Sequence, residues 1–471
     1  MKNFIALFAS AFLLVSCFEN EKAETTEVDS DTTAVQTEVL FHHPEWTRNA
    51  NIYEVNIRQF TKEGTLNAFE KHLPRLAEMG VDILWFMPIQ PIGYENRKGD
   101  LGSYYSIVDY TAMNPNYGTT EDFKRVVDSA HALGMKVILD WVANHTSFDN
   151  IWVTDRPDFY TTDSAGNFPI VALDNDGKPT DWTDVADLNY DNYDLQGAMT
   201  EAMRYWVYAG GIDGFRCDVA GFVPLEFWEY CIPRLKQSKD DLFFLAEWED
   251  PKYMSMFNMG YAWDLHHKMN EVAKGEKTPV VFDEYLKRLN EEFGPDDMQM
   301  AFTTNHDENS WNGTVFERFG DAHKTYFVLA TTFQNCMPLI YGGQEASLDH
   351  RLEFFSKDEI SWDNMELVPF YTEMLKLKHD NPALANGVAG GKMVKIETNH
   401  PDQIYAFSRE VDGNKVIVVL NFSNQEIEIP MSTLSNEKLN FTVHSSNGGM
   451  MMNNETKSLI IEPYGYYVFT K

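Results

Sequence analysis

The chain has 471 residues and carries 72 acidic against 38 basic side chains, a formal net charge of −34. This balance argues against nucleic acid as a partner, because binding to a phosphate backbone requires a basic surface. Hydrophobic residues make up 44% of the chain and aromatic residues 14%, which excludes a disordered acidic protein. The acidic excess is typical of a solvated surface that suits a neutral or cationic substrate.

The first 16 residues predict a secretory signal. A basic residue precedes an apolar run from Phe4 to Val15, which is too short to span a bilayer. A small residue followed at once by Cys17 resembles the signal of bacterial lipoproteins, in which this cysteine is lipidated and becomes the mature N-terminus. An ordinary cleaved signal with an accidental cysteine is the alternative. We expect residues 1–16 to be a lipoprotein signal peptide and Cys17 to anchor the protein outside the cytoplasm on a bacterial membrane, with the outer membrane preferred.

Residues 17–45 are predicted to form an acidic, flexible tether. Thr, Glu and Asp dominate from Glu19 to about Glu38, with almost no large apolar residue. Such a segment cannot bury enough apolar surface to offset the entropy lost on ordering.

The next part of the chain repeats one unit, an amphipathic helix followed by a glycine and a short apolar strand. One such helix is expected over residues 66–79, ended by Gly80 and followed by a strand over 83–86. Strand starts fall near residues 52, 83, 136, 212, 243, 300 and 338, and most gaps fit one βα unit of roughly 30–40 residues. The long gap after 243 leaves room for an eighth strand between Phe257 and Trp263.

Eight strands would close a (β/α)8 TIM barrel, which we expect over residues 46–147 and 188–382. An open, doubly wound sheet is the competing topology, and periodicity alone does not exclude it. The gap from 136 to 212 is too long for one unit, so residues 148–187, which are polar and aromatic, are expected to form a small inserted domain after the third strand.

Helical spacing ends at about residue 383. Residues 403–408 alternate between apolar and polar, Asp412-Gly413 predicts a turn, and 416–422 predicts a further strand. Residues 383–471 are therefore expected to form a separate, all-β sandwich domain, giving an α/β fold with a C-terminal β domain.

Four acidic residues stand at the ends of predicted strands: Asp140, Asp218, Glu247 and Asp307. The carboxyl ends of barrel strands open into the active-site mouth. A single acid after a strand is more often a helix cap or a turn residue. Four acids at equivalent positions around one barrel favour a functional role.

The surroundings of two of these acids predict opposite protonation. Arg216 and Asp218 are two residues apart on one strand and face the same side, so the guanidinium is expected to keep Asp218 ionised as a nucleophile. A structural ion pair is the alternative reading. Glu247 follows an apolar strand and precedes Trp248, surroundings that favour the protonated form of a general acid. Two carboxyls with opposed environments are the minimum machinery for glycoside cleavage.

These segments together resemble the α-amylase family of retaining glycoside hydrolases, glycoside hydrolase family 13. The resemblance runs from about Asn51 to the end of the chain. It rests on Asp-Trp-Val-Ala-Asn-His at 140–145, Gly-Phe-Arg-Cys-Asp at 214–218, Glu247, and Asn-His-Asp-Glu-Asn at 305–309, with supporting matches at 187–189 and 342–345. Each segment is short, but their order and spacing together are highly specific.

The resemblance implies that Asp218 is the nucleophile, Glu247 the acid/base and Asp307 the stabiliser of the transition state. It implies a second set of residues that bind the substrate: Tyr105, which stacks on a sugar, and Asp140, His145, Arg216 and His306. The family usually has a histidine two residues before the tyrosine, but here Ser103 stands there, so one donor to the sugar is changed or lost.

Calcium is a candidate cofactor by the same resemblance. Asn144 and Asp187 match the usual calcium-ligand positions, whereas Phe222 stands where many calcium-dependent members have His or Gly. Two side-chain ligands fall short of the 6–8 oxygens that calcium takes, so backbone carbonyls and water would have to supply the rest.

The leading functional hypothesis is a lipid-anchored α-amylase that cleaves internal α-1,4 bonds of starch or maltooligosaccharides, because a short inserted domain leaves the cleft open. A neopullulanase or α-1,6-glucosidase, or a transglycosylase of the same family, is the nearest rival. From another class, a non-catalytic glycan-binding lipoprotein is disfavoured, because the three central acids and Arg216 are all present.

Overall fold

The computed structural model describes residues 42–434, 442–446 and 457–471. The expected signal peptide, Cys17 and the expected tether up to residue 41 lie outside the described residues. None of the helices within the described ranges combines the length and the apolar character that a membrane span requires.

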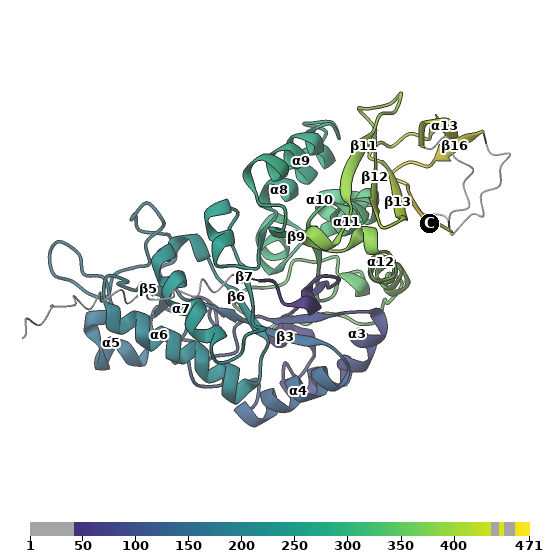
Figure 1. Cartoon of the computed structure of the whole chain (residues 1–471). Coiled ribbons are helices and arrows are strands. Elements are labelled where there is room, and N and C mark those ends of the chain that lie inside the picture. The colour runs from purple at the N-terminus through teal and green to yellow at the C-terminus, as the bar shows by residue number, and fades with distance from the viewer. Residues whose placement is uncertain (1–41, 435–441, 447–456) are drawn as a thin grey trace, which may run out of the picture. The chain divides into compact units, whose positions relative to one another are not determined.

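Eight parallel strands form a closed barrel (Figure 1). Strands that follow one another in the chain pair side by side, and the last pairs with the first. The strands are β1 (Ile52–Val55), β2 (Ile83–Phe86), β3 (Lys136–Trp141), β6 (Gly214–Cys217), β7 (Phe243–Ala246), β8 (Met259–Tyr261), β9 (Met298–Phe302) and β10 (Cys336–Tyr341). The predicted (β/α)8 barrel is confirmed, and the open doubly wound sheet is excluded.

The barrel interior is a packed core rather than a channel. Apolar side chains of the described residues reach it from every barrel strand except β6, among them Trp85, Phe243, Tyr261 and Leu339. Strand β6 instead contributes Arg216, whose guanidinium lies 5.0 Å from the centre of the Trp85 ring. A charged group therefore lies directly against this core, which is costly unless the charge is paired.

Helices cover the outside of the barrel (Figure 1). The longer ones are α3 (Leu73–Met79), α4 (Thr120–Ala132), α6 (Tyr193–Tyr205), α7 (Leu225–Lys236), α8 (Trp263–Ala273), α9 (Val281–Glu292), α11 (His323–Thr332) and α12 (Val368–Asp380). Short helices are α1 (Ile57–Phe60), α2 (Leu66–Phe69) and α10 (Val315–Phe319). Their apolar faces pack against the outer face of the strands in one continuous core.

The helix expected over residues 66–79 is interrupted. A 3₁₀ turn, Glu70–His72, separates α2 from α3. Pro74, near the start of α3, has no N–H to donate to the carbonyl of residue 70, so an unbroken helix would lose that hydrogen bond. The expected stop at Gly80 is confirmed, because this residue takes a left-handed conformation with φ of 95° that glycine adopts without strain.

Extra structure lies between β3 and β6. The strand β4 (His145–Ser147) pairs antiparallel with β5 (Val185–Asp187), and the helix α5 (Ile151–Asp155) lies between them in the chain. The segment therefore leaves and returns close to the end of β3. The predicted limits of the inserted domain, 148–187, stay a prediction.

The C-terminal part consists of two sheets. One holds β11 (Lys392–Ile396), β12 (Ile404–Val411), β13 (Asn414–Asn421), β17 (Tyr466–Thr470) and β15 (Thr442–Ser445); the other pairs β14 (Ile427–Pro430) with β16 (Ser458–Ile461). Side chains of both sheets share one apolar core, as expected for a sandwich. The four-residue α13 (Met431–Leu434) is the one α-helix among the described residues of this part. Buried Arg409 donates to the carbonyls of Thr332 and Phe333 beside the barrel, each at 3.1 Å.

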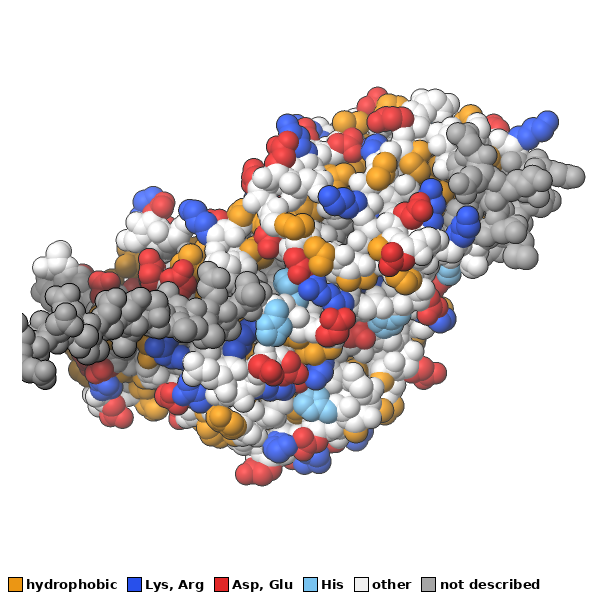
Figure 2. Space-filling view, in the orientation of Figure 1, with side chains coloured by type: hydrophobic (Ala, Val, Ile, Leu, Met, Phe, Trp, Pro, Cys, Tyr) orange, Lys and Arg blue, Asp and Glu red, His pale blue; other side chains and the backbone are white. Residues whose placement is uncertain are grey.

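Acidic and basic side chains are interspersed over the face shown in Figure 2, with scattered apolar groups between them. A mixture of both signs is typical of a solvated surface.

Candidate active site

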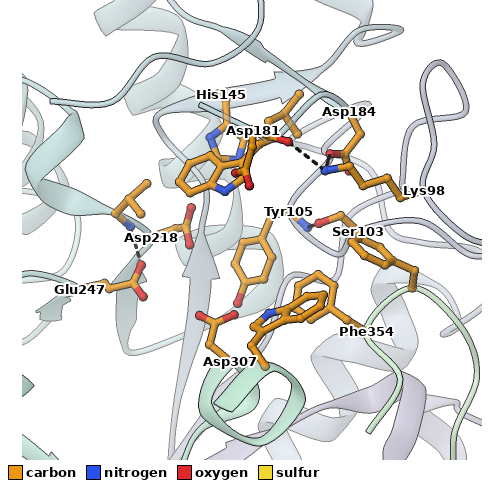
Figure 3. A pocket seen from close by; sticks show the side chains of 15 residues that line it. Lys98, Ser103, Tyr105, His145, Asp181, Asp184, Asp218, Glu247, Asp307 and Phe354 are labelled. Carbon is orange, nitrogen blue, oxygen red and sulfur yellow. Dashed lines mark hydrogen bonds and ion pairs between the residues drawn. The ribbon is translucent and has the colours of Figure 1, made fainter. Parts of the chain in front are cut away.

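The carboxyl ends of the barrel strands open into a cavity of about 380 Å³. Asp218 follows β6, Glu247 follows β7, and Asp307 comes shortly after β9; all three line the cavity (Figure 3). Tyr105 and His145 line it as well. The structure thus brings the three predicted catalytic acids together with two of the predicted substrate-binding residues in one pocket.

One guanidinium, that of Arg216, links three acids. Its Nη1 atom donates to Oδ1 of Asp140 and to Oδ1 of Asp218, each at 2.9 Å. Its Nη2 atom lies 2.7 Å from Oε1 of Glu247, in an ion pair that is not aligned as a hydrogen bond. The Nε atom donates to the hydroxyl of Tyr261 at 3.1 Å. The two carboxyls predicted to flank the scissile bond are therefore held on the same cation.

Sharing one cation leaves these acids short of positive charge. Burial raises the pKa of Asp218 well above its usual range; Arg216 opposes the rise, while Glu247 and Asp140 add to it. Burial also raises the pKa of Glu247 and of Asp140. Arg216 favours the ionised form of Asp218, as expected, but burial and the two neighbouring carboxyls outweigh it in the free site. The cluster therefore tends to retain a proton, which an acid–base couple requires.

The backbone between the two main acids is strained. Val219, directly after Asp218, has φ of 34° and ψ of 50°, a left-handed conformation that is unfavourable for a β-branched residue. Its N–H donates to Oε2 of Glu247 at 2.7 Å. Strain of this kind clusters at functional sites. Here the strained conformation directs the N–H of Val219 towards Glu247 and so orients that carboxyl. Sequence reasoning had no signal for this contact.

A second charged group, His306, connects Asp307 with a glutamate of β1. Its Nδ1 lies 2.6 Å from Oε1 of Glu54, and its Nε2 lies 3.2 Å from Oδ2 of Asp307. Burial lowers the pKa of His306, but Asp307 and Glu54 together raise it well above its usual value. Burial would raise the pKa of Asp307, yet His306 outweighs it and lowers that pKa. Asp307 is thus held ionised. Sequence reasoning missed Glu54, although a lone glutamate inside the apolar strand β1 was a usable signal.

Three of the predicted substrate-binding residues lie behind the cavity wall. Asp140 is fully buried and accepts hydrogen bonds from Trp85 Nε1 and from the Tyr105 hydroxyl, each at 3.1 Å. The same hydroxyl lies 2.7 Å from Nε2 of His306. Asp140, His306 and Arg216 are not among the described residues that line the cavity. From behind the wall, their contacts orient the lining side chains of Tyr105, Asp218 and Asp307.

The remaining predicted contacts lie at the cavity edge. Burial lowers the pKa of His145 to about 3, so this imidazole is neutral, and Asn144 lies 3.2 Å from its Nδ1. Ser103, which stands where the family usually has histidine, also lines the cavity, and its Oγ accepts the N–H of Tyr105 at 3.1 Å. A small hydroxyl therefore occupies the place of an imidazole.

The candidate calcium ligands do not fit a dedicated calcium site. Asn144 and Asp187 border a second cavity of about 390 Å³. However, Oδ2 of Asp187 accepts from the Thr161 hydroxyl at 2.6 Å and Oδ1 accepts from the N–H of Leu173 at 2.9 Å. Across the described ranges, no three His, Cys, Asp or Glu side chains gather as a metal-ligand cluster. We therefore assign no chemical step to calcium, and chelation with EDTA is the experiment that tests the cofactor expected from the resemblance.

A barrel with paired carboxyls on one cation and a third, ionised acid in the same cavity has the arrangement of a glycoside hydrolase. The chain belongs to the α-amylase family: the description "Alpha amylase, catalytic domain" matches residues 18–381, and "Maltogenic Amylase, C-terminal domain" matches residues 395–468.

Known relatives agree on the family but differ in activity. Alpha-amylase MalA of Haloarcula japonica is 26% identical over 401 residues, which cover 81% of this chain and 56% of that protein. Neopullulanase 2 of Thermoactinomyces vulgaris is 27% identical over 449 residues, covering 81% and 71%. The crystal structure of a maltogenic α-amylase, AmyB from Thermotoga neapolitana, has a TM-score of 0.78 at 27% identity, covering 90% of this chain and 98% of that one. The chain thus spans little more than half the length of the Haloarcula relative.

Proposed function

We propose that this glycoside hydrolase cleaves α-1,4-glucosidic bonds of starch or maltooligosaccharides with retention of configuration. The observation that carries the proposal is the shared guanidinium: Asp218 and Glu247 both contact Arg216 while lining one cavity. A nucleophile and an acid/base at close range on either side of a glycosidic bond are what retaining cleavage needs.

The two carboxyls divide the chemistry. Asp218 attacks the anomeric carbon while Glu247 protonates the departing glycosidic oxygen, which gives a covalent glycosyl-enzyme. Glu247 then takes a proton from water, and the water releases the sugar with its configuration retained. Retaining cleavage requires the shared proton on Glu247 and the negative charge on Asp218, and Arg216 contacts both carboxyls.

The third acid acts on the charge of the transition state. Asp307, held ionised by His306, faces the positive charge that develops on the sugar ring. Tyr105 offers an aromatic face to the C–H face of the same sugar. Its hydroxyl is fixed by Asp140 and His306, so the ring is oriented before the substrate arrives.

The test is to incubate the purified protein with starch and to measure new reducing ends, with the anomer of the first product followed by NMR. Release of the α-anomer supports the proposal. Retained starch binding without reducing ends would instead favour the non-catalytic glycan-binding protein.

The type of glycosidic bond that is cleaved, α-1,4 or α-1,6, is the part of the proposal for which a second candidate has support. The similarity to Neopullulanase 2 and to the maltogenic amylase C-terminal domain favours a neopullulanase-like member as the second candidate. A transglycosylase would use the same residues, with a sugar hydroxyl in place of water. Product profiles on amylose, pullulan and cyclodextrin, with and without an added acceptor sugar, separate these activities.

We also propose that the enzyme is lipid-anchored through Cys17 outside the cytoplasm of a bacterium. The proposal rests on the apolar run and the small residue before this cysteine. Labelling of expressing cells with radioactive palmitate tests it, with Cys17→Ser as the control. Equal labelling of both proteins would contradict the anchor.

A further inference from the structure

The cavity has two chemically different ends. In Figure 3, Glu247 lies on one side of the pocket, Lys98, Ser103 and Phe354 lie on the opposite side, and Tyr105 lies between them. The acid protonates the leaving oxygen, so the leaving part of the chain lies on the side of Glu247. The part that becomes attached to Asp218, the glycone, therefore points towards Lys98 and Phe354.

An ion pair bridges the glycone end. Lys98, on the loop between β2 and α4, places its Nζ 3.0 Å from Oδ1 of Asp184, which comes just before β5. The same Nζ donates to the carbonyl of Asp181 at 3.4 Å. The Lys98 side chain is 33% exposed and that of Asp184 only 5%, so the carboxylate is well shielded from water. We call this contact the Lys98–Asp184 bridge; it ties the barrel loop to the inserted segment.

The loop that carries Lys98 is fixed by close packing. Gly99 has φ of 62°, and a Cβ there would lie 2.6 Å from Cβ of Phe355, so a larger residue would clash. The N–H of Leu101 donates to the carbonyl of Phe355 at 2.9 Å. Arg58 donates from a single nitrogen to the carbonyls of Gly102 and Phe354, each at 3.0 Å. Two loops far apart in the chain are thus locked together behind the glycone end.

Aromatic side chains complete this wall. Phe354 stacks on Tyr105 with ring centres 6.3 Å apart and 14° between the planes. Trp311 lies 5.2 Å from Phe354 and 5.9 Å from Phe355, and all of them line the cavity. The rings of Trp311, Phe354 and Phe355 give this end of the cavity an aromatic wall, which the packed loops at 99–102 and 354–355 support.

The acid side is built differently. Trp182, Phe222 and Trp248 form a row of half-buried rings, with centres 5.9 Å apart at each step. Trp182 lines the cavity, and Trp248 borders a separate surface hollow beside Glu249. Aromatic faces of this kind stack on sugars, so a longer chain can continue in this direction. Phe222 lies in the middle of this row.

We propose that the Lys98–Asp184 bridge closes the glycone end, so that the enzyme acts on non-reducing ends and releases glucose or maltose rather than cutting internal bonds. The proposal rests on the α-glucan hydrolase function proposed above. The cavity volume of about 380 Å³ lies near the low end of the range for small-molecule sites, roughly 300–1,000 Å³. Internal cleavage was expected from the sequence because the inserted segment is short. That argument did not include Lys98, which reaches the inserted segment at Asp184.

The test compares maltoheptaose with the same sugar blocked at its non-reducing end by a 4,6-O-ethylidene group. Wild-type enzyme is expected to degrade the free sugar at least about tenfold faster than the blocked one, a discrimination within reach of a shaped pocket. The first products, followed by mass spectrometry, are expected to be glucose or maltose. Equal rates with products of intermediate length would overturn the proposal.

Lys98→Ala tests the bridge itself. Removing the ammonium is expected to raise the blocked-to-free rate ratio by about tenfold, because the end wall opens towards the insertion. Lys124→Ala is the matched control: Lys124 also pairs with an aspartate, Asp128, at 2.7 Å, but on the exposed face of α4. This variant is expected to keep the wild-type ratio. An unchanged ratio in a folded Lys98→Ala protein would overturn the role of the bridge.

The same experiments distinguish a failure of the proposed hydrolase function from a failure of the closed glycone end. If neither sugar is cleaved, hydrolysis of α-1,4 bonds is refuted, and calorimetric binding of the same two sugars still tests the closed end. Preference for the free end would support the closed pocket, and equal affinities would overturn it.

Discussion

Replacing Arg216 by methionine removes the one cation that three buried carboxyls share. Met has a similar length and no charge, so the change deletes the bonds to Asp140, Asp218 and Glu247 with little change in packing. A hydrogen bond to a charged group contributes about 1.5–3 kcal/mol. One pKa unit corresponds to about 1.36 kcal/mol, so losing the bond to Asp218 raises the pKa of that carboxyl by about 1–2 units.

The sign of the kinetic effect follows from the role of Asp218. Attack needs the anionic carboxylate, and Arg216 is the group that opposes its protonation. The acidic limb of the kcat/KM profile is therefore expected to move upward by about 1–2 pH units in Arg216→Met. Stability changes as well, because leaving buried charges without their partner costs about 3–5 kcal/mol.

The stability loss should depend on pH. A carboxyl whose folded pKa lies above its unfolded value adds stability at pH below the unfolded pKa and loses it as pH rises through the folded pKa. Without Arg216 the folded pKa of Asp218 rises further, so the variant is expected to be more destabilised at pH 7 than at pH 4. Urea unfolding at both pH values measures this difference.

Arg409→Met is the matched control. Arg409 is also almost fully buried, but it donates to carbonyl oxygens of Gly391, Thr332, Phe333 and Ala385 and has no carboxylate partner among the described ion pairs. Its loss is expected to lower stability and to leave the acidic limb in place. An Arg216→Met enzyme that folds and keeps the wild-type limb would refute the proposed role of the shared cation.

Three further changes test other parts of the site. Asp218→Asn should abolish turnover while keeping the wild-type thermal midpoint, and substantial residual activity would move the nucleophile elsewhere. Glu54→Gln removes an anionic partner of His306 and lowers the pKa of that imidazole. The stability that the His306 charge adds is full below about pH 6.5 and is lost as pH rises through the raised folded pKa. Urea unfolding of Glu54→Gln should therefore show a loss of unfolding free energy of about 1.5–3 kcal/mol at pH 6 and a smaller loss at pH 9. Equal losses at the two pH values would contradict the ion pair. Excess EDTA should change neither starch cleavage nor the thermal midpoint, because both oxygens of Asp187 already accept protein hydrogen bonds; a drop in either would restore calcium as a cofactor.

Local patterns were enough to predict the barrel. Each βα unit carries its own periodicity, so strand positions could be counted along the chain. Even β8, only three residues long, followed from the length of the gap between its neighbours. The acids after β6 and β7 could be placed in one pocket because parallel strands end at the same face.

Contacts between distant segments could not be predicted from these patterns. The Lys98–Asp184 bridge joins residues 86 positions apart in the numbering, on loops that have no periodicity. Glu54 lies in β1 and meets His306 only because the barrel closes. The protonation of a carboxyl also depends on all of its charged neighbours. Arg216 beside Asp218 predicts an ionised carboxylate, whereas Asp140 and Glu247, which share the same guanidinium, favour the protonated form.

The two cations of the site explain how acids of similar chemistry take different roles. Arg216 contacts three carboxyls, so that cluster is short of positive charge and tends to retain a proton, which an acid–base couple requires. His306 lies against Asp307 and keeps it ionised beside the developing positive charge. Burying five carboxyls around two cations costs stability, and a protein that only binds neutral glucans would gain nothing from it. The distribution of charge, more than the presence of any one acid, therefore favours catalysis over simple binding.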